Sequence, residues 1–219
     1  MKYVNKFLII LKSFIFSFYF TILSLFSSRV GVSSSSNYVV SLTTYRKRLP
    51  FVYLTIESLL RQKSKPKRII LVLSYEDCSP ENLPFLLCRQ KTRGLEVKFV
   101  SGNYKSYKKL SYAFEYGGLS HGMYVVTADD DVFYPDYWLE VFKKYSKTFP
   151  DRVLCFRGRV INFTSLIEVE DYGLWKLASV KDVRHNNLIP TGVSGVCYPY
   201  WALLLNSMRR HGSPMLFSS

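Results

Sequence analysis

The stretch Met123–Asp131, MYVVTADDD, runs from apolar and β-branched residues directly into three consecutive carboxylates. A short apolar run followed by polar residues is typical of a buried strand in a parallel sheet. We therefore predict a strand over Met123–Thr127, with the Asp triplet (Asp129–Asp131) at its carboxyl end. Ligands of parallel sheets bind beyond the carboxyl ends of the strands. The triplet is therefore the first candidate for a binding site.

Strand and helix patterns alternate along the chain before this stretch. The expected strands and helices, in order, are Tyr38–Leu42, Phe51–Gln62, Arg68–Ser74, Leu83–Arg93, Leu95–Val100 and Ser106–Tyr116. After the triplet we expect a helix over Asp136–Phe149, a strand over Val153–Phe163 and a loop of small residues over Gly192–Val196. Alternation of this kind implies parallel β-α units. The predicted fold class is α/β: a single Rossmann-like domain whose mostly parallel, twisted sheet is flanked by helices.

A hydrophobic segment precedes this domain. Phe7–Phe26 is almost wholly apolar, and a helix of that length spans about 30 Å, enough to cross a bilayer, although Lys12 interrupts it. Three interpretations stay open: a membrane anchor, a signal peptide, or an interfacial or core-packed element. The anchor is favoured, with membrane association through residues 7–28. We therefore divide the chain into a hydrophobic segment with a Ser-rich linker, 1–36, and a globular domain, 37–219.

Composition limits the partners. The 219 residues carry 30 Lys and Arg against 16 Asp and Glu, which gives a net charge of +14 and favours anionic ligands. The 48% of hydrophobic residues excludes a disordered chain. The four cysteines lie far apart without a C-x-x-C pair, so we expect buried free thiols and no zinc site.

The Asp triplet has a specific chemical use. Adjacent carboxylates repel one another unless water or a cation neutralises them. Side chains two residues apart share a face of an extended strand, so Asp129 and Asp131 can turn the same way. Their hard oxygen atoms suit Mg²⁺ or Mn²⁺, with water and a diphosphate completing the coordination. The alternative is a solvated turn that caps the following helix.

Several segments in this order resemble bacterial glycosyltransferases of family 2, which have the nucleotide-diphospho-sugar transferase (glycosyltransferase-A) fold. The segments are residues 40–62, 65–74, 93–100, 106–110, 125–140 and 192–199. The resemblance implies transfer of a sugar from a nucleoside-diphosphate sugar to an acceptor hydroxyl. It further implies a metal-dependent reaction in cell-surface polysaccharide or glycan synthesis, with a glycan or lipid-linked acceptor and a membrane-associated enzyme whose catalytic domain is cytoplasmic.

The same resemblance assigns residues. The nucleotide-binding residues would be Thr43, Thr44, Tyr45, Arg48, Ser74, Lys108, Lys109, Asp129 and Asp130. The metal ligands would be Asp129 and Asp131, although the usual family motif begins one residue earlier, at Ala128. Gly192 and Gly195 would belong to a loop that approaches the donor sugar.

The catalytic base of the family has no counterpart here. The family places an acidic pair shortly after the glycine loop, but no Asp or Glu follows Asp182. We therefore expect a chain shortened at its acceptor part, and the weak substitutes for the base are Glu168, Glu170 and Asp171. One alternative is a non-catalytic remnant that still folds and binds a nucleotide. A remote alternative is a nucleic-acid-binding protein that uses basic and aromatic residues, which the acidic triplet opposes, so we expect no nucleic acid.

Overall fold

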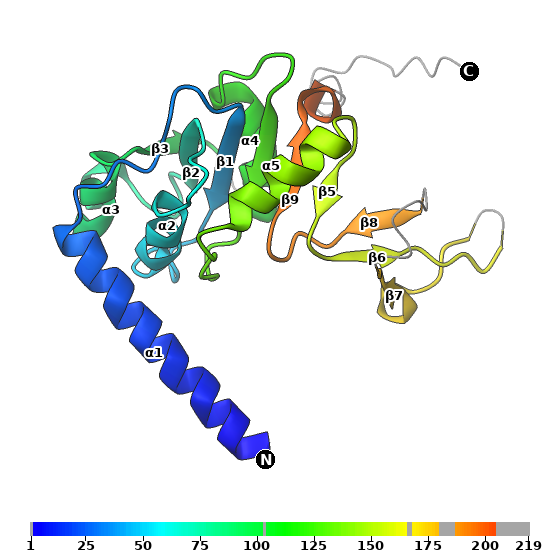
Figure 1. The fold of residues 1–219 in the computed structure, drawn as a ribbon, viewed down its shortest axis with the longest axis horizontal. Helices are drawn as coiled ribbons and strands as arrows, with labels where there is room; N and C mark the ends of the chain where they lie inside the picture. Colours follow the sequence, from blue (N-terminus) through cyan, green and yellow to red (C-terminus); the bar gives the residue numbers. More distant parts are fainter. Residues whose placement is uncertain (1, 103, 166–167, 180–186, 205–219) are drawn as a thin grey trace.

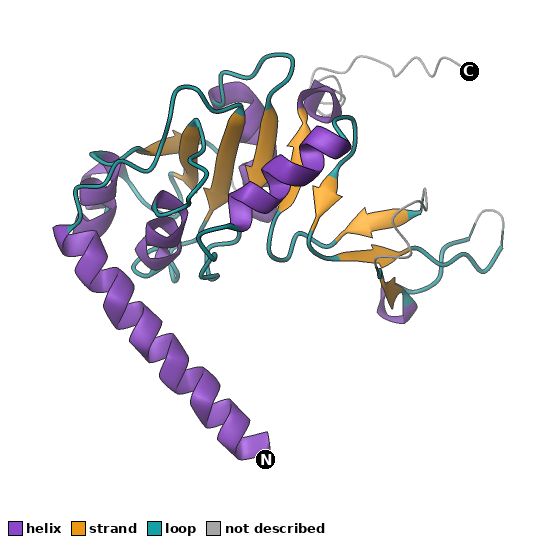
Figure 2. Ribbon diagram, in the orientation of Figure 1, coloured by secondary structure: helices purple, strands orange, loops and turns teal. Residues whose placement is uncertain are grey.

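The computed structural model describes residues 2–102, 104–165, 168–179 and 187–204. Its centre is a six-stranded sheet with the strand order β3-β2-β1-β4-β9-β5 (Figures 1 and 2). These strands are β1 Tyr38–Thr43, β2 Arg68–Ser74, β3 Leu95–Val100, β4 Tyr124–Thr127, β5 Leu154–Cys155 and β9 Val196–Pro199. The first four pair in parallel, whereas β9 runs antiparallel to both β4 and β5. The predicted mostly parallel α/β sheet is confirmed.

Helices cover both faces of this sheet. They are α2 Val52–Leu60, α3 Phe85–Lys91, α4 Lys108–Tyr116 and α5 Trp138–Thr148, with short 3-10 turns at Pro80–Asn82, Lys105–Tyr107 and Tyr172–Leu174. A further helix, α1 Lys2–Phe26, packs with its end on α2 and α3 and extends away from the sheet (Figure 1). One apolar cluster joins the sheet to α2, α3 and α5, and a second joins the opposite face to α4. The expected N-terminal apolar helix is present as α1.

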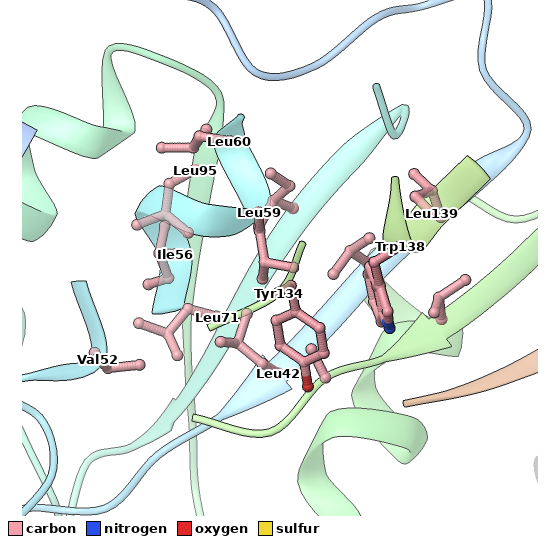
Figure 3. Close-up of a cluster of buried hydrophobic side chains, with 14 of the residues drawn as sticks. Leu42, Val52, Ile56, Leu59, Leu60, Leu71, Leu95, Tyr134, Trp138 and Leu139 are labelled. Atoms are coloured by element: carbon pink, nitrogen blue, oxygen red, sulfur yellow. The ribbon is translucent and has the colours of Figure 1, made fainter. Parts of the chain in front are cut away.

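Side-chain alternation along the central strands explains the two clusters. On β2, Leu71 belongs to the cluster shown in Figure 3, and its neighbours Ile70 and Val72 belong to the other. All three are fully buried. Because successive side chains of a strand point to opposite faces, a strand covered on both sides reads as an uninterrupted apolar run. This is the pattern from which these strands were predicted.

The C-terminal part differs from the prediction in two ways. The single strand expected over Val153–Phe163 is wrong: β5 ends at Cys155, and β6, Gly158–Val160, pairs in a separate sheet of order β7-β6-β8. Between them Phe156 turns onto α5, with its ring 4.9 Å from that of Phe142. The other strands of the separate sheet are β7 Lys176–Leu177 and β8 Leu188–Pro190. The second difference is β9, which begins at the end of the expected small-residue loop.

All four cysteines are free, as predicted. Cys78 and Cys197 are buried, and burial raises the pKa of the Cys197 thiol. The prediction of burial is wrong for Cys88, which is exposed, and for Cys155, which is half-buried. The exposed Cys88 lies on the short helix α3, whose fully buried side chains are Leu87 and Gln90.

Candidate active site

The Asp triplet and the loop after β1 lie together at the carboxyl edge of the sheet. Thr44 Oγ1 donates a hydrogen bond of 2.5 Å to Asp130 Oδ2. Arg48 Nη1 lies 2.7 Å from Asp130 Oδ1 and 3.0 Å from Asp131 Oδ2. The parallel pairing of β1 with β4 brings these two strand ends to the same edge. One guanidinium group thus offsets two of the three carboxylates.

Asp129 faces a different set of partners. Lys109 Nζ, from α4, lies 2.8 Å from Asp129 Oδ1, and the backbone N–H of Ser194 donates to Asp129 Oδ2 over 3.3 Å. The Asp129 N–H donates to the phenol oxygen of Tyr134 over 2.8 Å. Burial raises the pKa of Tyr134, so the phenol stays neutral beside the carboxylates. Lys109 therefore offsets the charge of Asp129, and Arg48 offsets the charges of Asp130 and Asp131.

The glycine loop reaches the triplet through its backbone. Gly195 has a φ of +106°, and a Cβ atom there would lie 2.7 Å from Trp138 Cζ2 and 3.1 Å from the Thr127 carbonyl oxygen. The indole N–H of Trp138 donates to the Ser194 carbonyl oxygen over 2.8 Å. Only glycine fits such a close approach at positive φ. Gly192 also has a positive φ, but no atom of the described residues beyond its chain neighbours lies within 4 Å of its Cβ position.

The two lysines that were predicted together have separate partners. Lys108 is almost fully buried, and its Nζ lies 3.2 Å from Asp77 Oδ2. The Arg46 backbone N–H donates to the other oxygen of Asp77 over 3.2 Å. Asp77 therefore links α4 to the loop after β1. Sequence reasoning missed it, although it follows the carboxyl end of β2 as the triplet follows that of β4.

The other predicted nucleotide neighbours are engaged mainly by the protein itself. Thr43 Oγ1 donates to the Val72 carbonyl oxygen over 2.7 Å, and the fully buried Ser74 accepts the Glu76 N–H over 3.3 Å. Tyr45 differs, because its exposed ring lies 5.4 Å from the Arg48 guanidinium carbon. Tyr45 is therefore the aromatic side chain at this loop that could stack on a base.

A hollow of about 260 Å³ opens beside the carboxylates on the side of Arg48. Its lining residues are Arg48, Phe51, Leu54, Thr55, Asp130, Asp131 and Phe133. The hydrogen bond with Asp130 raises the pKa of Arg48, so this cation stays charged at the mouth of the hollow. The charged groups thus lie beside an apolar wall.

Hard oxygen ligands are present, but they are shared with cations of the protein. Asp129 is paired with Lys109, and Asp131 with Arg48. In the part of the chain that the structure describes, no group of three or more His, Cys, Asp or Glu side chains converges on a metal-sized point. Carboxylate oxygens are the kind of ligand that Mg²⁺ and Mn²⁺ prefer, and a diphosphate and water would have to complete any coordination by these two residues.

The weak candidates for the catalytic base lie elsewhere. Glu168, Glu170 and Asp171 belong to the segment between β6 and β7, beside the separate sheet (Figure 1). Glu170 uses its carbonyl oxygen to accept the Trp175 indole N–H over 2.7 Å, and Glu168 Oε2 lies 3.4 Å from Thr164 Oγ1. None of the three has a described contact with the triplet. Residues 180–186, which contain Asp182, lie outside the described part.

Comparisons with known proteins give a family and a similar fold for this chain. The model of the family "Glycosyl transferase family 2" matches residues 40–212, and no curated protein matches the chain. Among solved structures, S. aureus TarS 1–349 has a TM-score of 0.51 and 16% identity, over 78% of this chain and 49% of that one. The mannosyltransferase PcManGT from Pyrobaculum calidifontis, in complex with GDP-Man and Mn²⁺, has a TM-score of 0.40 and 17% identity, over 59% and 39%.

The two comparisons support different statements. The likeness to TarS concerns the fold, and this chain spans about half the length of that structure. The family model covers most of the chain, from β1 through β9, and includes the triplet, its two cationic partners and the glycine loop. The chain therefore belongs to glycosyl transferase family 2.

Proposed function

We propose that the protein transfers a sugar from a nucleoside-diphosphate sugar to an acceptor hydroxyl. The observation that carries this proposal is the placement of Lys109, Arg48 and the Ser194 N–H around the Asp triplet at one edge of the sheet. Structurally similar proteins were solved with UDP-GlcNAc, UDP and GDP-Man. We propose the same class of donor here, with a glycan or lipid-linked acceptor in cell-surface polysaccharide or glycan synthesis.

In this proposal the residues of the chain act mainly through fixed charge. The leaving nucleoside diphosphate gains negative charge as the glycosidic bond breaks. Lys109 and Arg48 are held at the edge by the carboxylates, so their positive charge is already placed next to the proposed diphosphate site. Asp77 binds both the buried Lys108 and the Arg46 backbone N–H, so the loop that carries Tyr45, next to the proposed position of the nucleobase, keeps its shape.

The proposal includes a divalent cation, Mg²⁺ or Mn²⁺, held by Asp129 and Asp131. When bound, such an ion acts as a Lewis acid and a template for the diphosphate. Lys109 and Arg48 would then shift from the carboxylates toward the phosphate oxygens. Among the described residues, none of the candidates for the base that takes the acceptor proton contacts the triplet.

The proposed location is the membrane surface, with the catalytic domain in the cytoplasm. Leu8–Phe26 of α1 is long and apolar enough to be a candidate membrane span, and only 11% of it is buried against the protein. An apolar helix exposed to this degree needs an apolar environment. Membrane association also suits a lipid-linked acceptor.

Donor turnover tests the proposed function. The purified chain is incubated with UDP-, GDP- and dTDP-sugars and Mn²⁺, and release of the nucleoside diphosphate is measured. We expect turnover with at least one donor and a loss of about a hundredfold in Asp131→Ala. Asp151→Ala removes a carboxylate from an exposed turn after α5 and is the matched control, expected to keep the activity of the parent chain.

Two results would contradict the proposal. Absence of turnover with every donor, in a chain that unfolds cooperatively, would favour the non-catalytic remnant. Equal losses in Asp131→Ala and Asp151→Ala would remove the triplet from the reaction.

A further inference from the structure

The last two turns of α1 are built into the globular domain. Phe20 and Ser24 are buried, and Ser24 Oγ donates to Glu57 Oε2 of α2 over 3.1 Å. Glu57 is fully buried and accepts two hydrogen bonds, of 2.6 and 2.8 Å, from Arg93, which is also buried. A buried charge pair tolerates little displacement, because an unpaired charge in the interior is strongly destabilising. This end of α1 is therefore not free to leave the domain.

One ridge of α1 faces the domain along this contact. Lys12, Phe16, Phe20 and Ser24 follow one another at intervals of four residues, so they lie on one side of the helix. The rings of Phe16 and Phe20 lie 6.0 and 5.3 Å from that of Phe133, which follows the Asp triplet. The ridge thus carries most of the described docking contacts, and Thr21, beside it, adds a contact of 2.8 Å between its hydroxyl and that of Tyr53. Lys12 lies on the same side of α1, before the docked turns.

The opposite side of α1 is an apolar stripe. Leu11, Phe14, Phe18, Ile22 and Leu25 recur at intervals of three and four residues, and each is at least 37% exposed. At about 100° per residue they fall within an arc of about 80°, centred away from the ridge. Other exposed apolar residues flank it (Leu8, Ile10 and Ile15), and Ile9 lies on the side of the ridge. The stripe continues over the docked turns, where Phe26 is also exposed.

We propose that this stripe binds the surface of a lipid bilayer, with α1 lying in the plane of one leaflet instead of crossing both. Docking removes Phe20–Phe26 from the candidate span Leu8–Phe26, which leaves Leu8–Tyr19, about 18 Å of apolar helix against about 30 Å of hydrocarbon. The part of α1 that precedes Leu8 carries Lys2 and Lys6 in its sequence. In the plane, the stripe enters the acyl chains and Lys12 faces the headgroups. An interfacial helix buries one apolar face at the boundary of headgroups and acyl chains, and in α1 the face opposite the stripe packs on the protein.

The positive net charge of the chain favours binding to anionic lipids. The net charge is +14, and Lys12 lies on the side of α1 that would face the headgroups. Each Lys or Arg near an anionic surface contributes about 1 kcal/mol of attraction. The proposed partner is therefore a leaflet that contains anionic phospholipid, and the catalytic domain rests on it through α1.

Vesicle binding by charge-substituted chains tests the orientation of α1. Full chains with Phe18→Asp or Ser13→Asp are sedimented with vesicles of phosphatidylcholine and phosphatidylglycerol, after equal unfolding transitions have been verified. Phe18 is on the stripe, and Ser13 is an exposed residue on the other side. We expect Phe18→Asp to weaken binding about fiftyfold or more and Ser13→Asp less than about fivefold. Equal losses, or no binding by the parent chain, would overturn the proposal.

Accessibility of the N-terminus tests it without changing α1. The full chain, with a protease-cleavable tag before Met1, is added to preformed vesicles of the same composition. An in-plane helix leaves the tag outside, so we expect complete cleavage by added protease in intact vesicles. A tag that resists cleavage until detergent is added would show a crossing helix and overturn the proposal.

Discussion

Two parts of the globular domain, a first half from β1 to β4 and a second half after α5, differ in how far their structure is determined by buried side chains. From β1 to β4, strands of four to seven residues pair in parallel, and Val39, Ile70, Leu71 and Val125 are fully buried. After α5, the strands are two to four residues long, and β7 is exposed at both positions. The first half is held by its core, whereas the second has few interior contacts of its own. The predictions that follow test this difference.

The largest effect is expected from the buried charge pair of the first half. Arg93→Met leaves Glu57 buried without its partner and should lower the free energy of unfolding by about 3–5 kcal/mol. Arg159→Met in the second half removes a hydrogen bond of 2.6 Å to the Trp175 carbonyl oxygen and should lower it by about 1 kcal/mol. Urea unfolding of both variants measures the two values. Equal effects would refute the contrast.

Truncation of an apolar side chain should likewise lower the stability more in the first half than in the second. Leu71→Ala empties a fully buried site on β2 and is expected to cost about 2–5 kcal/mol of stability. Leu177→Ala changes a residue on β7 that is 56% exposed, so a change within about 0.5 kcal/mol is expected. Denaturant midpoints give both values. A loss above 2 kcal/mol for Leu177→Ala would mean that the second sheet has a core of its own.

The glycine loop lies between β8 and β9 and packs on α5, and it should be sensitive at one glycine more than at the other. Gly195→Ala would bring a Cβ atom 2.7 Å from Trp138 at a φ of +106°, and we expect a loss of about 2–3 kcal/mol. Gly192→Ala meets no atom of the other described residues and should cost about 1 kcal/mol for its positive φ alone. Thermal unfolding compares them. A larger loss in Gly192→Ala would contradict the close approach at Trp138.

The smallest effect is a pH-dependent one at the edge of the first half. A hydrogen bond from Arg68 lowers the pKa of Glu96 below its ordinary value. Because the folded-state pKa is the lower one, the stabilisation is present above the ordinary pKa and is lost as the pH falls through the folded-state value. We expect Glu96→Gln to be about 1 kcal/mol less stable than the parent chain at pH 7. At pH values below the folded-state pKa the two chains should unfold alike, and a difference that persists there would contradict this origin.

The same contrast explains how much could be predicted from the sequence. The strands Arg68–Ser74 and Leu95–Val100 were predicted with their observed bounds. A strand covered on both faces is a continuous apolar run, as in Arg68–Ser74, and the strand at the end of the sheet, Leu95–Val100, has alternating apolar and polar residues. The single strand expected over Val153–Phe163 was wrong, because this stretch contains two short strands, β5 and β6, that belong to different sheets. β9 was missed because Gly195 and its small neighbours indicate a loop, and the pairing with β4 comes from the tertiary structure.

The candidate site could be predicted where it follows a buried strand. The Asp triplet was identified from its place after such a strand and Arg48 from the family resemblance, and the two lie within hydrogen-bonding distance in the structure. The division of charge between Arg48 and Lys109 could not be predicted, because it depends on where α4 packs. Asp77 was missed for the same reason, since its partner Lys108 is far away in the sequence.

Binding of a nucleoside diphosphate tests the central claim most directly. The free energy of unfolding is measured with UDP or GDP, with and without Mn²⁺, in the parent chain and in Lys109→Met. At a hundred times its dissociation constant, the ligand should add about 2.7 kcal/mol to the stability of the parent chain when Mn²⁺ is present. Most of this gain should be absent in Lys109→Met. No stabilisation by either diphosphate, or equal stabilisation of both chains, would contradict a diphosphate site at the Asp triplet.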